Sequence, residues 1–363
     1  MVEGPHKNRP IVGESFVELT VDFLLGLGLG AYLIEKHYPR YGLTYHFKLD
    51  IDHPVDRTYI VDEASTVPPL LSFQVNRFTL DREVRERNLK NGVQTIDGTV
   101  TGVDIGTGDE LHTVTVHDIA QQKHTLRARW LIDATGRNRV LSKLLGLRHR
   151  AVKEQKNVFG FRLLNFDPDI LGRIHALKKK NRAFVPYFVT HHFFGKGNWI
   201  WCIPMRSPEG QPLISIGITY RKDIYPYGEV RTMEQFLECV GREHEVIVEL
   251  ARSGTVVDTN FYSSYMWECR QRYIHPMAVG MALSSVQIRQ IAAIIKRELS
   301  GHATYEFTKD LDTAIAKFQG GVTRDTTRLY ECMGDAYQCH LRIHLVVTAL
   351  FHLALPMLMN EWL

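Results

Sequence analysis

The segment Asp133-Ala134-Thr135-Gly136 is the first part of the sequence whose residue types and position suggest a binding site. It follows the apolar run Trp130-Leu131-Ile132, which we expect to end a buried strand, and it precedes a predicted helix. Ligands of open α/β sheets bind at the carboxyl ends of strands, where the chain turns towards a helix. We therefore predict a ligand site at this small-residue turn.

A second candidate is the hexapeptide Trp199-Ile200-Trp201-Cys202-Ile203-Pro204, in which two tryptophans stand two residues apart. Alternate side chains of a strand point to one face, so both indoles would lie on the same side. Burial in a core is one interpretation, because aromatic residues at this period are typical of packed sheets. A functional signature is the other interpretation, and matches elsewhere in the chain have to decide between them.

Two further groups of reactive side chains are assigned no site. Cys332, Cys339 and His340 could share a helix face, but a metal site needs more ligands, and packed thiols explain them better. The basic run at residues 178–182 is typical of a solvated loop rather than a phosphate site. The sequence therefore predicts no metal site.

The composition is that of a globular protein without a strong electrostatic field. The 363 residues are 44% hydrophobic, and 44 basic against 40 acidic side chains give a formal charge of +4. This length suits about two domains, and the small excess favours neither nucleic acid nor an acidic membrane as partner. Five scattered cysteines without a CxxC pair indicate a reducing compartment, and we expect the cytoplasm. The apolar stretch 344–359 is interrupted by Pro356, so we expect a docked helix there rather than a membrane span.

These candidates have to be positioned by two kinds of element. Residues 14–37 suggest a loop followed by a buried helix, and runs at 98–105, 111–119 and 125–130 predict an antiparallel meander. The hexapeptide should pair with residues 213–220 across a turn, which implies a second, antiparallel sheet.

Several separated segments together resemble the flavin-dependent halogenases, within the wider flavoprotein monooxygenase fold. They are Gly13-Glu14-Ser15 after Ile11-Val12, Gln74-Val75-Asn76-Arg77, Asp133-Ala134-Thr135-Gly136, the WxWxIP hexapeptide, and Gly280-Met281-Ala282-Leu283. They occur in the family's order over nearly the whole chain. The resemblance implies an α/β fold: an incomplete Rossmann-like FAD-binding domain at 1–150 and 270–305, an antiparallel substrate-binding domain at 151–269, and a helical region at 306–363.

The resemblance also implies FAD as cofactor. Glu3 matches the acid that accepts from the adenosine ribose hydroxyls, and Arg77 matches an arginine beside the diphosphate. Asp133, Ala134, Thr135 and Gly136 match the turn against the nucleotide, and Gly280 and Met281 match a helix N-terminus near the flavin.

In such halogenases, reduced FAD and oxygen convert chloride to hypohalous acid, which reaches a lysine beside an electron-rich aromatic substrate through a tunnel. Trp199 and Trp201 match the tunnel wall, and Glu14 and Ser15 match the strap that joins the flavin and substrate sites. The expected partners are a small aromatic molecule and a separate flavin reductase, because no second nucleotide fold is visible. Secondary metabolism is the implied setting.

Three departures from the family pattern leave other functions open. The GxGxxG segment and a Gly-Asp segment have no counterpart, and Arg40 in Arg40-Tyr41-Gly42 stands at the position of the family's catalytic lysine. From these we expect a truncated or degenerate flavin site with weak FAD uptake. The alternatives are an FAD-dependent monooxygenase or reductase that does not halogenate, and a non-catalytic descendant that binds a small molecule or a protein.

Overall fold

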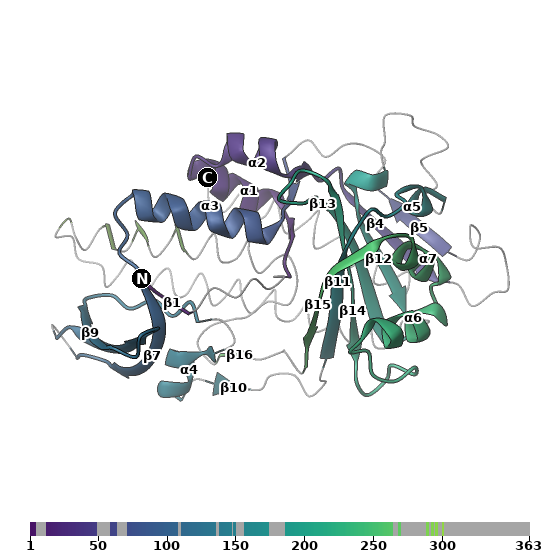
Figure 1. The fold of residues 1–363 in the computed structure, drawn as a ribbon. Coiled ribbons are helices and arrows are strands. Elements are labelled where there is room, and N and C mark those ends of the chain that lie inside the picture. Colours follow the sequence, from purple (N-terminus) through teal and green to yellow (C-terminus); the bar gives the residue numbers. More distant parts are fainter. Residues whose placement is uncertain are drawn as a thin grey trace. The chain divides into compact units, whose positions relative to one another are not determined.

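The computed structural model describes residues 1–4, 12–48, 59–63, 71–107, 110–135, 138–146, 148–149, 156–173, 186–263 and 268–269, with 288–289, 292–293, 295–296 and 300. These residues form a mixed α/β structure, as predicted (Figure 1). The chain divides into a first unit of 1–11, 77–153 and 266–274 and a second unit of 12–76, 154–265 and 275–363. The predicted helical region at 306–363 lies outside the described residues. The FAD-binding and substrate-binding roles predicted for the domains remain predictions.

The first unit is built on a four-stranded sheet in the order β1-β7-β8-β9. Its strands are β1 (Val2–Glu3), β7 (Ile96–Asp104), β8 (His112–Asp118) and β9 (Lys123–Ala128). β1 runs parallel to β7, whereas β7, β8 and β9 are antiparallel, which confirms the predicted meander. The unit also contains α3 (Arg77–Lys90), α4 (Val140–Leu144), and the short antiparallel pair β10 (Arg148–His149) and β16 (Glu268–Cys269).

The prediction of a buried strand before Asp133 is wrong. β9 ends at Ala128, and residues 129–133 have no strand structure. Trp130 is 41% exposed and Ile132 is 62% exposed. A strand requires a neighbour for its backbone N–H and C=O groups, and no strand of the described residues pairs with this segment. Apolar content alone was therefore a poor guide here.

The second unit contains a seven-stranded sheet in the order β15-β11-β14-β13-β12-β4-β5. The strands are β4 (Leu43–Lys48), β5 (Tyr59–Glu63), β11 (Lys156–Leu164), β12 (Thr190–Gly195), β13 (Asn198–Arg206), β14 (Pro212–Arg221) and β15 (Thr255–Tyr262). Only β12 and β4 are parallel among these described neighbours. The hexapeptide lies in β13, and its pairing with β14 confirms the predicted hairpin and the antiparallel second sheet.

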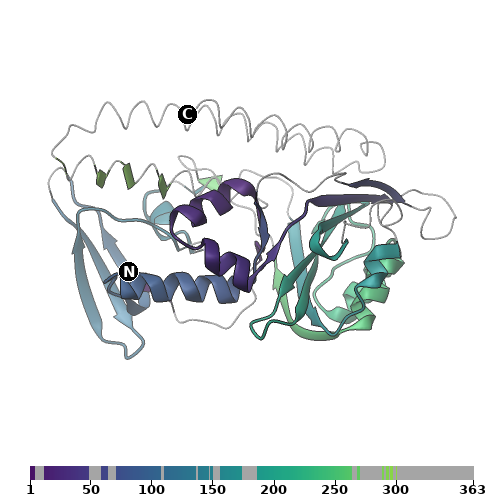
Figure 2. The same ribbon diagram turned by 90° about the horizontal axis from the view of Figure 1, so that it is seen from above.

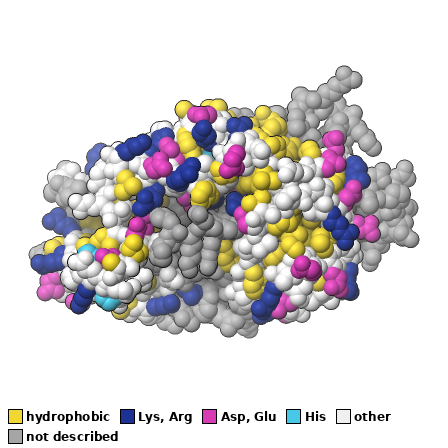
Figure 3. All heavy atoms as spheres, in the orientation of Figure 1, with side chains coloured by type: hydrophobic (Ala, Val, Ile, Leu, Met, Phe, Trp, Pro, Cys, Tyr) yellow, Lys and Arg dark blue, Asp and Glu magenta, His cyan; other side chains and the backbone are white. Residues whose placement is uncertain are grey.

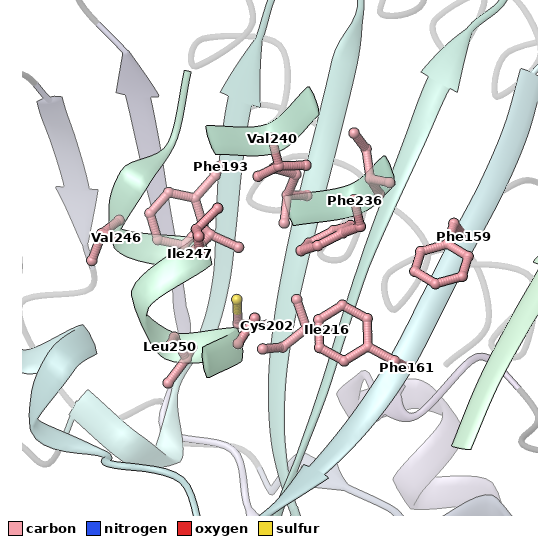
Figure 4. Close-up of a cluster of buried hydrophobic side chains, with 14 of the residues drawn as sticks. Phe159, Phe161, Phe193, Cys202, Ile216, Phe236, Val240, Val246, Ile247 and Leu250 are labelled. Carbon is pink, nitrogen blue, oxygen red and sulfur yellow. The ribbon is translucent and has the colours of Figure 1, made fainter. Parts of the chain in front are cut away.

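One face of this sheet is covered by helices, as Figures 1 and 2 both show. The helices are α5 (Asp169–Arg173), α6 (Met233–Gly241) and α7 (Glu245–Ser253), and a short 3-10 helix spans Pro186–Phe188. In Figure 4, Phe161, Cys202 and Ile216 of the sheet meet Phe236 of α6 and Ile247 of α7. Because Cys202 points to the helices, strand alternation puts Trp201 on the opposite face. Trp201 packs there with Val158, Ile203, Met205 and Leu213.

Two further helices of the second unit precede this sheet in the chain. The predicted single buried helix is instead two helices, α1 (Glu18–Gly26) and α2 (Gly30–Lys36), separated at Gly28, which has a φ of 72°. Leu27 and Ile34 are 53% and 68% exposed, so burial is only partial. A small sheet joins β2 (Ser15–Phe16), β6 (Phe73–Gln74) and β3 (Tyr38–Pro39) in that order.

The described surface carries charges of both signs. On the face drawn in Figure 3, basic and acidic side chains are interspersed over both units, consistent with the small net charge of +4. Among the described residues, no helix has the length and apolar character needed to cross a membrane.

Candidate functional site

Trp201 is fixed against the backbone of the seven-stranded sheet. It stands directly opposite Gly217, which in turn pairs with Gly160. A Cβ atom at Gly217 would lie 2.1 Å from Cζ2 of Trp201, and one at Gly160 would lie 3.2 Å from the same atom. The indole Nε1 donates to Oγ of Ser215 at 3.3 Å, and the side chain is only 4% exposed. Trp201 is therefore a core residue that occupies a glycine-lined depression.

Trp199 lies on the same face but is only partly buried. Its ring centroid is 5.9 Å from that of Trp201, and its Nε1 donates to Nδ1 of His192 at 3.0 Å. The His192 ring stacks on Tyr45 with centroids 5.2 Å apart and an interplanar angle of 21°. Tyr45 and His192 are direct partners across the parallel pair β4 and β12. Three aromatic side chains from three adjacent strands thus form a continuous wall, which we call the aromatic wall: Tyr45, His192 and Trp199.

The His192 ring is neutral at ordinary pH. Burial, the positive charge of Arg40 and the neighbouring His191 lower its pKa to about 3. The wall therefore contains no cation of its own, although the guanidinium of Arg40 acts on it electrostatically.

Arg40 is buried, and its guanidinium is directed into the protein. It is 6% exposed, and Nε donates to Oγ of Ser72 at 3.2 Å. One terminal nitrogen donates to Oγ of Ser15 at 3.3 Å and the other to a carboxylate oxygen of Glu18 at 3.2 Å. Burial lowers the pKa of Arg40 from its ordinary value, and Glu18 and Tyr45 oppose that shift. An arginine in this pairing remains charged.

The predicted strap residues Glu14 and Ser15 lie in the same part of the second unit. Both are buried, at 3% and 9% exposure. Ser15 pairs with Gln74 in the small sheet, and its Oγ lies 3.1 Å from Oγ1 of Thr190 at the start of β12. Ser15 therefore connects the small sheet, Arg40 and the large sheet.

The two predicted nucleotide contacts at Glu3 and Arg77 are engaged in ion pairs within the first unit. A carboxylate oxygen of Glu3, at the end of β1, accepts from Nε of Arg85 at 2.7 Å, and Arg85 also lies 3.5 Å from Asp97. Arg77 donates to both carboxylate oxygens of Asp81 at 2.9 and 3.1 Å. Each predicted contact is thus held in a fixed orientation by a charged neighbour.

The Asp133 carboxylate is occupied by its own turn. One oxygen accepts from the backbone N–H and the hydroxyl of Thr135, and the other accepts from the N–H of Leu141 in α4 at 2.8 Å. These bonds lower the pKa of Asp133 although partial burial opposes the shift. The geometry is that of a cap on α4, with the exposed Ala134 beside it. Gly136, Gly280 and Met281 lie outside the described residues.

The structure thus brings Glu14, Ser15, Arg40, Trp199 and Trp201 into one unit. Sequence reasoning missed Tyr45, His192, Glu18 and Ser72. His192 could have been found, because its place in the strand before the hexapeptide gives it the same face as Trp199. Tyr45 gave no such signal, since its pairing with β12 joins distant parts of the chain.

Comparison with known proteins agrees with the resemblance read from the motifs. No family model matches the chain. A flavin-dependent halogenase, chlA of Dictyostelium discoideum, is 23% identical over 97% of this chain and 63% of its own length. A 1H-pyrrole-2-carbonyl-[peptidyl-carrier protein] chlorinase of Pseudomonas fluorescens is 24% identical over 77% of this chain and 66% of its own length.

Solved structures agree in fold. The crystal structure of the halogenase PltM superposes with a TM-score of 0.76 at 16% identity, covering 99% of this chain and 77% of PltM. The chain spans less than two thirds of the length of each of these two sequence relatives. In its motifs, its sequence matches and its fold, this chain is therefore similar to the flavin-dependent halogenases.

Proposed function

We propose that this protein is an FAD-dependent halogenase that uses reduced flavin and oxygen to chlorinate an electron-rich aromatic small molecule. The observation that carries the proposal is the aromatic wall of Tyr45, His192 and Trp199. Arg40 acts electrostatically on Tyr45 and His192 and donates a hydrogen bond to Ser15 of the strap. The three rings face one another, so an aromatic ligand would meet their edges in an edge-to-face arrangement, and the neutral histidine imposes no charge on it. The sequence match to two halogenases, one of them named for a pyrrole substrate, supports the same chemistry.

The described residues fit part of an FAD site. Glu3 ends a strand that is parallel to its neighbour, and its carboxylate can accept ribose hydroxyls while Arg85 holds one oxygen. Arg77 at the start of α3 can add a phosphate contact to its bond with Asp81. Bound reduced FAD would supply two of the four electrons that reduce oxygen, and chloride would supply the other two as it is oxidised to hypohalous acid. PltM, which shares the fold, has been crystallised with FAD and phloroglucinol. We expect a separate reductase to deliver the reduced flavin.

Arg40 has a different role in this proposal from that of a lysine that binds hypohalous acid. Its buried guanidinium donates hydrogen bonds to Ser72, Ser15 and Glu18. It therefore links the strap to α1, and we call this arrangement the brace. We propose that Arg40 positions the strap and contributes its charge to the aromatic wall. The same burial favours a second candidate function, an FAD-dependent monooxygenase, because such an enzyme needs no exposed amine beside the substrate.

The test is an assay with purified protein, FAD, a flavin reductase, NADH, chloride and a phenol such as phloroglucinol. Because the GxGxxG and Gly-Asp segments have no counterpart, we expect weak FAD uptake, and FAD is therefore supplied in excess. A yellow protein with micromolar or better affinity would refute the degenerate flavin site. We expect a product whose mass spectrum carries the chlorine isotope pattern. The pattern should change to that of bromine when bromide replaces chloride. Hydroxylated product in both salts would support the monooxygenase, and absence of both products with excess FAD would refute both enzymes in favour of a non-catalytic binding protein.

A further inference from the structure

His192 has a defined tautomer because of its bond to Trp199. The indole Nε1 can only donate, so Nδ1 of His192, 3.0 Å away, has to be the acceptor and carries no hydrogen. In a neutral imidazole the hydrogen then resides on Nε2. Burial and Arg40 keep the ring neutral by lowering its pKa to about 3. His192 therefore presents one N–H donor in a fixed direction.

This donor has no partner among the residues that the structure describes. The bond to Trp199 is the only hydrogen bond that the His192 side chain makes with the described residues. The contrast with its neighbour is informative: His191, on the opposite face, lies 3.2 Å from Nε2 of His46, and both of those rings are fully buried. His192 is only partly buried, so its Nε2–H is accessible to a ligand as well as to water. A partly desolvated donor gains a favourable bond when an acceptor arrives.

The surroundings of the donor select the chemistry of that acceptor. The ring lies between Tyr45 at 5.2 Å and Trp199 at 5.4 Å, so a planar ligand can pack edge-to-face against the edges of these rings. The positive charge of Arg40 acts on the same imidazole, which favours an oxygen with negative character and disfavours a cationic ligand. An aromatic ring bearing a hydroxyl or its conjugate base meets both conditions.

We propose that His192 is a specificity-determining residue whose Nε2–H donates to the phenolic oxygen of the substrate. The inference rests on the proposed function and names its substrate class, the phenols. The bond orients the ring against the aromatic wall, and it therefore determines which ring carbon is halogenated.

The direct test uses the wild-type protein, labelled with ¹⁵N-histidine and titrated with resorcinol or with 1,3-difluorobenzene. We expect the His192 imidazole spectrum to show the Nε2–H tautomer, and the Nε2 resonance to shift with resorcinol and not with the fluoro analogue. The proposal is overturned if the spectrum shows that the hydrogen of His192 is on Nδ1. It is also overturned if the Nε2 resonance does not shift with resorcinol at millimolar concentration.

Two variants make the test quantitative. His192→Phe retains an aromatic ring without the donor, and it should weaken resorcinol binding about tenfold, as loss of one hydrogen bond predicts, with 1,3-difluorobenzene unaffected. His117→Phe, in β8 of the first unit, is the matched control and should bind both ligands like the wild type. Equal resorcinol affinity in His192→Phe and the wild type would refute the proposal, and the wild-type spectra decide the matter if His192→Phe does not fold.

The outcome is separable from that of the proposed function. If the enzyme halogenates phenols with an unchanged isomer ratio in His192→Phe, the inference fails and the function stands. If FAD is not bound and no halogenated product forms, the function fails, although the response of His192 to resorcinol can still be observed.

Discussion

The packing of Trp201 against two glycines allows a quantitative test of the candidate site. In Gly217→Ala, the new methyl group would lie 2.1 Å from Cζ2 and 2.3 Å from Cη2 of Trp201, and 2.8 Å from the carbonyl oxygen of Phe159. A rigid indole held by Ser215 and a backbone oxygen cannot both yield without strain. Overpacking of this kind costs about 1–3 kcal/mol, and we expect Gly217→Ala to lie near 3 kcal/mol.

A graded series separates this mechanism from a general effect of losing glycine. Gly160→Ala has its closest contact with Trp201 at 3.2 Å, so its cost should be only about 1 kcal/mol. Gly102→Ala in β7 meets nothing closer than 3.5 Å and should be neutral or slightly stabilising. Trp201→Phe removes Cζ2 and Cη2, so adding it to Gly217→Ala should recover about 1–2 kcal/mol relative to additivity.

The assay is urea unfolding of each variant, followed by circular dichroism and tryptophan fluorescence, to compare free energies of unfolding. The reasoning is refuted if Gly217→Ala is no more costly than Gly160→Ala. It is also refuted if Gly217→Ala and Trp201→Phe are additive, because the clash would then not involve the indole.

Two further perturbations test the buried polar groups of the second unit. Arg40→Met leaves Glu18, whose side chain is 19% exposed, and two serines without their donor, and it should lower the free energy of unfolding by about 2–4 kcal/mol in urea titrations. Arg40→Lys should cost less, about 1–2 kcal/mol, because an ammonium keeps the charge without the three-way fork; equal losses would contradict the brace. Burial and then the charge of Arg206 lower the pKa of His37 to about 4, so its contribution is complete above pH 6.5 and is lost as the pH falls through 4. At pH 5 about 2 kcal/mol of this stabilisation has been lost. The difference in free energy of unfolding between pH 7.5 and pH 5 should therefore be about 2 kcal/mol smaller in His37→Gln than in the wild type.

The sequence predicted the parts of the fold that depend on local alternation. The β13–β14 hairpin and the meander of β7, β8 and β9 have polar turns between alternating runs, and their neighbours along the chain are also their neighbours in the sheet. The joining of β4 to β12 was not predictable, because nothing in either strand specifies a parallel partner from a distant part of the chain. The error at residues 129–133 has the same origin, since apolar content does not supply a strand with its partner.

The candidate site was also predicted only in part from the sequence. The motifs identified Trp199, Trp201, Ser15 and Arg40, but not what surrounds them. The direction of the Arg40 guanidinium depends on Ser72 and Glu18, and the tautomer of His192 depends on one hydrogen bond. Such properties arise from the three-dimensional contacts of a side chain, and residue type alone does not encode them.

The two tryptophans of the hexapeptide show how neighbours on adjacent strands separate packing from binding. Both indoles lie on the same face, but Trp201 stands opposite Gly217 and Trp199 opposite Thr219. A glycine partner lets the Trp201 ring reach the backbone, where it is buried, whereas a β-branched partner holds the Trp199 ring higher, against His192. Changes at Trp201 should therefore act through the stability of the sheet, and changes at Trp199 through the ligand and the tautomer of His192. The core interpretation of the motif describes Trp201, and the proposed function applies the functional interpretation to Trp199.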